Sequence, residues 1–170
     1  MAFINRMTGQ DYIDKTREYL NYLEEHLENV RRAFCDLSTV CDGMHWVGDD
    51  FSWHSLRAEV ECHDLSKFSV EEFVQYRKSF YPVSEKEREN SDLESAWKNH
   101  KQKNTHHHES VKSYIDVIHM VIDWTAMSYK FGGSAQQYYE ENKNKITLEL
   151  SLKNFMYEIF DKVREKKGSC

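Results

Sequence analysis

Apolar residues recur every three or four positions along most of the chain, and alternation with a period of two is almost absent. Between about residues 11 and 36, seven apolar side chains follow this spacing: Tyr12, Tyr19, Leu20, Leu23, Leu27, Val30 and Phe34. A period near 3.6 residues places such side chains on one face of an amphipathic helix. The pattern therefore predicts an all-α protein that begins with one long helix.

The same spacing predicts shorter helices further along the chain. They are expected at about residues 53–62, 69–80, 92–103, 110–131, 134–142 and 149–166. Residues 37–52 are expected to form a loop. Ser69 and Glu72 have the spacing of a capping box and predict a helix start, whereas Gly132 and Gly133 are typical of a helix end.

Composition and charge narrow the function classes. A length of 170 residues without repeats or linkers fits a single helical domain over residues 1–170. The net charge of −6 argues against general nucleic-acid binding, which needs a basic surface, but not against a small phosphorylated substrate. There is no run of about 18 apolar residues, so no membrane span is expected. The four cysteines form no Cys-x-x-Cys pair and follow no secretion signal, which predicts free thiols in a cytoplasmic protein.

Four residues with metal-ligating side chains occur at positions that are expected to be buried or at helix ends. His26 lies within the apolar stripe of the first helix, His63 and Asp64 stand together near the end of the second, and Asp123 interrupts the most apolar helix. A buried Asp needs a cation or hydrogen-bond donors. Two common helical signatures, Glu-x-x-His and His-Glu-x-x-His, are absent, so neither a ferritin-like di-iron bundle nor a metalloprotease of that type is supported.

The order His, His-Asp, Asp on successive helices resembles the HD-domain superfamily of metal-dependent phosphohydrolases. The stretch HDLSK at residues 63–67 is similar to the His-Asp-x-Gly-Lys form of that superfamily, with Ser66 where Gly is usual. HDLSKFSVEEF, NTHHH and DWTAMSYKFG together resemble more closely a small uncharacterised family of bacteria and their phages, over about residues 15–145. The resemblance implies an HD-like helical bundle in which His26, His63, Asp64 and Asp123 hold a metal ion.

The resemblance also implies further site residues. Two-metal HD enzymes carry extra histidines between the His-Asp pair and the last Asp, and His100, His106 and His107 lie in that interval. They are candidate ligands of a second ion, or alternatively side chains of a polar surface loop. Lys67 is a candidate for binding and neutralising a substrate phosphate, or is an ordinary solvated lysine, and Ser66 is a candidate lining residue.

These ligands would form a nitrogen and oxygen set with open water positions, which suits one or two ions of Mn, Fe, Co, Ni or Mg. The expected function is hydrolysis of a nucleotide or related small phosphate ester by a water that the metal activates, with Asp64 and Lys67 in catalytic roles. Two alternatives stay open. One is a di-iron oxygenase on the same scaffold, and the other is a non-enzymatic phage or bacterial protein that binds a signalling nucleotide or a host protein. The sequence does not indicate an oligomeric state.

Overall fold

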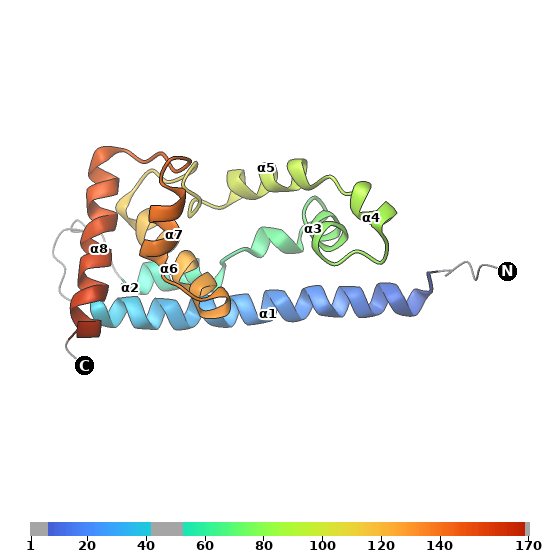
Figure 1. Cartoon of the computed structure of the whole chain (residues 1–170), viewed down its shortest axis with the longest axis horizontal. Helices are drawn as coiled ribbons and strands as arrows, with labels where there is room; N and C mark the ends of the chain where they lie inside the picture. The colour runs from blue at the N-terminus through green and yellow to red at the C-terminus, as the bar shows by residue number, and fades with distance from the viewer. Residues whose placement is uncertain (1–6, 42–52, 169–170) are drawn as a thin grey trace. The chain divides into compact units, whose positions relative to one another are not determined.

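The structure, a computed structural model, describes residues 7–41 and 53–168, and every regular element in these residues is a helix (Figure 1). The predicted all-α class is therefore confirmed. The elements are α1 (Gly9–Val40), α2 (Trp53–Glu61), the 3-10 helix η1 (Leu65–Phe68), α3 (Phe73–Phe80), α4 (Glu85–Glu89), α5 (Leu93–Lys103), α6 (Tyr114–Phe131), α7 (Ala135–Asn142) and α8 (Leu150–Gly168). No helix in these ranges combines the length and the apolar character that crossing a membrane requires.

Contacts within the chain define two compact units. The larger unit contains residues 26–63 and 104–170, and the smaller unit contains residues 1–25 and 64–103. One boundary between the units falls between the neighbours His63 and Asp64. The single domain that we expect over residues 1–170 stays a prediction.

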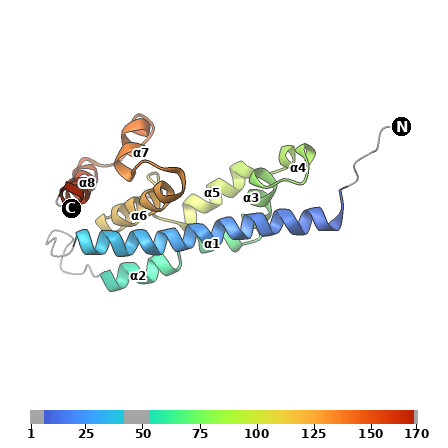
Figure 2. The ribbon, with the colours of Figure 1, turned by 60° about the horizontal axis from the view of Figure 1, so that its bottom comes forward.

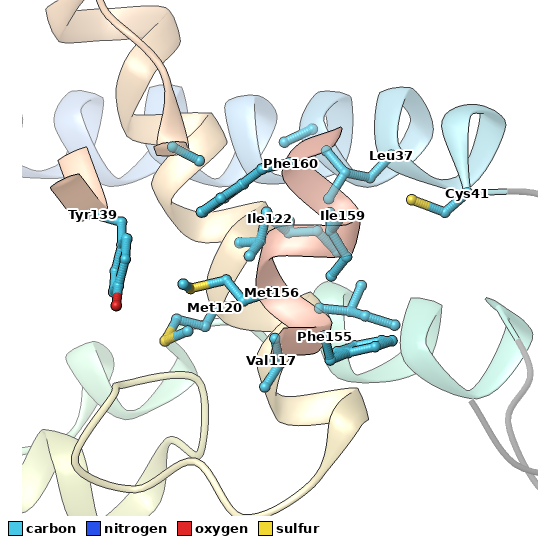
Figure 3. Packing of buried hydrophobic residues seen from close by; sticks show 14 of the residues in the cluster. Leu37, Cys41, Val117, Met120, Ile122, Tyr139, Phe155, Met156, Ile159 and Phe160 are labelled. Carbon is cyan, nitrogen blue, oxygen red and sulfur yellow. The ribbon is translucent and has the colours of Figure 1, made fainter. Parts of the chain in front are cut away.

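The larger unit has the main hydrophobic core, which is formed around α6. Its residues Val117–Ile122 are all buried, and they pack with side chains of α8 and of the second half of α1 (Figure 3). Val30, Leu56 and Met156 are each completely or almost completely excluded from solvent within this core. Figure 2 shows α2 lying beside the second half of α1, as Figure 1 also does. A core of this kind gives the polar side chains of α1, α2 and α6 fixed positions.

The smaller unit has its own apolar cluster. Tyr19 and Leu23 from α1 pack with Tyr76 from α3 and Ala96 from α5. An ion pair joins α3 to α4. The Nη1 and Nη2 atoms of Arg77 both donate to the carboxylate of Glu87, which also accepts the backbone N–H of Val83 at 2.8 Å. The ion pair fixes α4, whose sequence EKERE has no buried residue of its own.

Several predicted helix ends differ from the observed ones. Helix α1 continues to Val40, so residues 37–40 are not loop, and the remainder of the expected loop, residues 42–52, lies outside the described residues. The predicted capping box of Ser69 and Glu72 is wrong, because α3 begins at Phe73 and Glu72 caps it with no side-chain bond. The predicted stop after α6 is confirmed, since Gly132 has φ 84°.

Candidate metal centre

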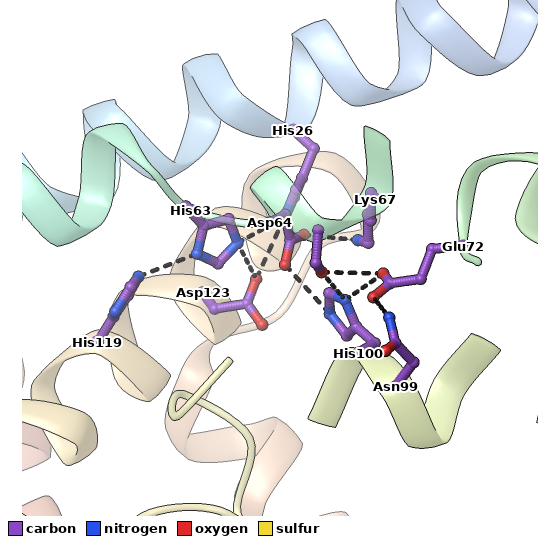
Figure 4. Close-up of polar contacts among 10 residues, drawn as sticks. His26, His63, Asp64, Lys67, Glu72, Asn99, His100, His119 and Asp123 are labelled. Carbon is purple, nitrogen blue, oxygen red and sulfur yellow. Dashed lines mark hydrogen bonds and ion pairs between the residues drawn. The ribbon is translucent and has the colours of Figure 1, made fainter. Parts of the chain in front are cut away.

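Three side chains of the larger unit meet at one point, although they come from distant parts of the chain. His26 is provided by α1, His63 by the turn that follows α2, and Asp123 by α6 (Figure 4). The Nε2 atoms of His26 and His63 lie 3.0 Å apart. The Oδ1 atom of Asp123 lies 3.5 Å from the first of these nitrogens and 3.6 Å from the second. Both imidazoles are buried, and only 14% of the Asp123 side chain is exposed.

These separations fit ligands of a single ion. With metal–nitrogen and metal–oxygen bonds of about 2.1 Å, neighbouring ligand atoms are about 3.0 Å apart at right angles and about 3.4 Å apart in a tetrahedron. The three observed separations lie at or close to these values. Two imidazoles and one carboxylate also leave several coordination positions for water or a substrate. His26, His63 and Asp123 can therefore hold a divalent cation as they stand.

The electrostatic surroundings keep Asp123 ionised. Burial raises the pKa of its carboxyl, but the interactions with His63, His26 and His106 outweigh burial and leave the pKa below its ordinary value. A carboxylate is the form that binds a cation.

Three further histidines of the larger unit lie around His63 or next to a ring that does. His119, one turn before Asp123 on α6, has its Nε2 atom 3.0 Å from the Nδ1 atom of His63. The ring of His106 stacks on that of His63 with 4.3 Å between centroids, and the ring of His107 lies 4.4 Å from that of His106. His63, His106 and His119 form a second group of buried imidazoles with ligand atoms close together.

Asp64 belongs to the smaller unit, where its carboxylate contacts Lys67 and His100. Its Oδ2 atom accepts a hydrogen bond of 2.6 Å from the Lys67 ammonium, and its Oδ1 atom lies 3.2 Å from Nε2 of His100. Asp64 is buried and has a left-handed backbone with φ 57°. It lies in the turn between α2, which ends at Glu61, and η1.

Glu72, also in the smaller unit, contacts Ser66, Asn99 and His100 (Figure 4). Its fully buried carboxylate accepts hydrogen bonds from the Ser66 hydroxyl at 3.0 Å and from the Asn99 amide at 2.7 Å, and lies 2.8 Å from Nδ1 of His100. Ser66 has no positive φ, so its backbone does not require a glycine.

The predicted site residues are divided between the two units. His26, His63, Asp123 and His106 share the larger unit, whereas Asp64, Ser66, Lys67 and His100 share the smaller one. A single site with all four HD residues as ligands stays a prediction.

Sequence reasoning missed two residues of these networks. His119 stands four residues before Asp123, so from the sequence alone it either orients that carboxylate or is partly exposed. It is in fact only 4% exposed, and its hydrogen-bond partner is His63. The spacing of Glu72 from Ser69 predicts a capping role, but its carboxylate instead contacts Ser66 and Asn99. The available signal for His119 was the unbroken apolar character of its helix, which leaves no clearly solvated face.

A groove of about 830 Å³ lies elsewhere on the larger unit. It is lined by residues of α1, α6 and α8 such as Leu37, Val121 and Phe160, with Arg32 among its polar side chains. None of the clustered imidazoles lines it, so it is not the candidate site.

Fold and site together define an all-α protein with a buried cluster of imidazole and carboxylate side chains that can hold a metal ion. The chain belongs to DUF5662, a family of unknown function, whose sequence pattern matches residues 15–162. No curated protein and no solved structure matches the chain.

Proposed function

We propose that the protein is a metal-dependent phosphohydrolase that acts on a nucleotide or a related small phosphate ester. The observation that carries the proposal is the meeting of His26, His63 and Asp123 with separations suited to one ion. The His63-Asp64 pair and Lys67, in the HDLSK stretch that resembles the HD superfamily, support the choice of phosphate chemistry.

Each of the three candidate ligands in the larger unit has a definite role in this proposal. His26 and His63 offer neutral Nε2 lone pairs, and Asp123 supplies a negative charge that offsets only part of the charge of a divalent ion. An ion held there lowers the pKa of a water ligand and polarises a phosphoryl oxygen. The remaining positive charge favours an anionic substrate over a neutral one.

The roles of the residues in the smaller unit are proposed only from the resemblance to the HD superfamily. Asp64 would complete the ligand set, Lys67 would balance charge on the phosphate, and Ser66 and His100 would line the site. In the described contacts Lys67 is paired with Asp64, so its proposed role requires that pair to open or to act as a unit. Three free thiols, Cys35, Cys41 and Cys62, fit the proposed cytoplasmic location.

The test is a metal-dependent turnover assay. Purified protein is stripped with a chelator, reloaded separately with Mn, Co, Ni or Mg, and given nucleoside monophosphates, triphosphates and cyclic dinucleotides. The proposal expects phosphate release that Asp123→Asn abolishes and that a variant of an exposed histidine of α2, His54→Gln, retains. A wild type that binds one nucleotide tightly and returns it unchanged on denaturation supports a sequestering protein instead.

One observation favours a second function. Two histidines and one carboxylate are the ligand set of many non-haem iron oxygenases, and the larger unit presents this set as His26, His63 and Asp123. An iron oxygenase would contain iron as purified and consume oxygen in the presence of its organic substrate. Iron content and oxygen uptake therefore separate the two reactions.

A further inference from the structure

His63 is flanked by another imidazole at each of its ring nitrogens. Its Nε2 atom lies 3.0 Å from Nε2 of His26, and its Nδ1 atom lies 3.0 Å from Nε2 of His119 (Figure 4). All three residues are buried, with at most 4% of each exposed. Because water is nearly excluded, the partner rings decide which nitrogen of His63 carries the proton.

Counting protons leaves one arrangement that frees His63 Nε2 for a metal. A neutral imidazole has one N–H and one lone pair. If the N–H is on Nδ1, His63 donates to Nε2 of His119, and its own Nε2 lone pair faces His26 and Asp123. If His119 donates instead, the proton of His63 sits on Nε2 and blocks that nitrogen as a ligand.

The other side of His119 supports the first arrangement. When its Nε2 accepts from His63, its proton is on Nδ1, and this atom lies 3.8 Å from the Oε2 atom of Glu59 on α2. That distance is too long for a direct hydrogen bond but brings a carboxylate to the N–H side. The Glu59 side chain is 49% exposed. It therefore places a carboxylate acceptor at the protein surface, next to His119, which in turn contacts the buried ring of His63.

We infer that His119 is a positioning residue that holds His63 in its Nδ1–H form and so directs the Nε2 lone pair toward the metal position. The inference rests on the proposed metal site but not on the reaction carried out there. Outer partners of this kind fix the orientation and tautomer of metal-binding imidazoles, and their loss costs about 10- to 100-fold in metal affinity.

The stacked ring of His106 does not account for the same effect. It covers the face of His63, with an interplanar angle of 28°, whereas His119 meets the Nδ1 edge. Stacking restricts how the ring tilts, but it does not decide which nitrogen carries the proton.

The first experiment compares two replacements of His119 in the full chain. The amide oxygen of His119→Gln can accept from His63 Nδ1–H, whereas His119→Met fills similar volume without a comparable acceptor. Co²⁺ titrations followed by visible absorption are expected to show about a 10- to 100-fold weaker affinity for His119→Met. His119→Gln should remain within about threefold of wild type, and His54→Gln serves as a control for loss of an exposed histidine.

Equal affinities for wild type and His119→Met would overturn the inference. An equal loss in both His119 variants would also overturn it, because the acceptor would then be irrelevant and only packing would matter.

A second measurement does not depend on metal. Long-range ¹⁵N–¹H spectra of the histidine rings in metal-free protein should show His63 as the Nδ1–H tautomer in wild type and His119→Gln, with that preference lost in His119→Met. An Nε2–H tautomer of His63 in wild type would refute the inference. Absence of phosphate release with the expected tautomer and Co²⁺ affinities would instead refute the proposed function alone.

Discussion

The Nε2 atoms of His26 and His63 lie 3.0 Å apart, although 37 residues separate them in the chain. Bringing two imidazole nitrogens together in a buried place costs solvation unless they share a proton or a cation. Asp123, with its lowered pKa, adds a negative charge beside them. The larger unit thus has the nitrogen atoms and the charge for a cation before any substrate is considered.

The first prediction follows from this pair. Replacing His26 with Gln should reduce Co²⁺ affinity by more than the 10- to 100-fold typical of an outer partner, since it removes a direct ligand. The fold should persist, because the apolar face of α1 keeps Val30, Ala33 and Leu37 in the core. Titration with Co²⁺ and a circular-dichroism spectrum check both parts, and unchanged affinity would remove His26 from the site.

The sequence predicted the helices and this ligand group for different reasons. Periodic apolar positions, which depend only on local geometry, marked most helices. His26 and Asp123 stood out because each interrupts an apolar stripe. Helix α4 (Glu85–Glu89) was not predicted, because it has no apolar stripe. It is held in place by the contact of Glu87 with Arg77, which is ten residues away in the chain.

Other parts of the site could not be predicted for equally physical reasons. Helix α6 is apolar on most of its surface, so its periodicity could not tell whether His119 faces solvent or the site. Glu72 has capping spacing from Ser69, yet tertiary partners, among them Asn99, compete more strongly for its carboxylate. Local spacing cannot reveal such competition.

The second prediction concerns Ser66, whose hydroxyl donates to the fully buried carboxylate of Glu72. Ser66→Ala should lower the free energy of unfolding by about 1–2 kcal/mol, because a buried acceptor loses a donor. Ser66→Gly should cost about 0.5–1 kcal/mol more through backbone entropy. Urea denaturation measures both variants, and a Gly variant as stable as wild type would contradict this account.

The third prediction is a dependence of stability on pH. The hydrogen bond with Arg77 holds the pKa of Glu87 below its usual 4.5, against the opposing effect of burial. A lowered folded-state pKa stabilises the protein above pH 4.5, and this contribution is lost as the pH falls through the folded value. Glu87→Gln should therefore destabilise the protein by about 3 kcal/mol at neutral pH and progressively less in acid.

Glu85 on the same helix provides the control for Glu87. Its ion pair with Arg88 is exposed, so Glu85→Gln should change the free energy of unfolding by less than about 1 kcal/mol. Denaturation curves of both variants between neutral pH and about pH 3.5 test the difference. A destabilisation by Glu87→Gln that does not shrink in acid would show that its carboxylate charge is not the cause.

The last prediction concerns Asp64, whose place beside His63 suggested the metal site. Asp64→Asn should keep the left-handed backbone, since Asn tolerates φ near 57°, whereas Asp64→Ala should add about 1–2 kcal/mol of strain. Both variants leave Lys67 without its carboxylate partner. Under the proposed function, Asp64→Asn abolishes metal-dependent phosphate release and loses less stability than Asp64→Ala, because Asn avoids this backbone strain.

The measurement pairs phosphate release with thermal unfolding for the two Asp64 variants. Glu61→Gln is the control, because it removes an acidic group that is exposed and paired only at the surface with Arg31. If Asp64→Asn releases phosphate as fast as wild type while Asp123→Asn does not, Asp64 is a structural partner of Lys67 and His100. If neither variant affects a measurable wild-type rate, the reaction does not use the cluster around His63.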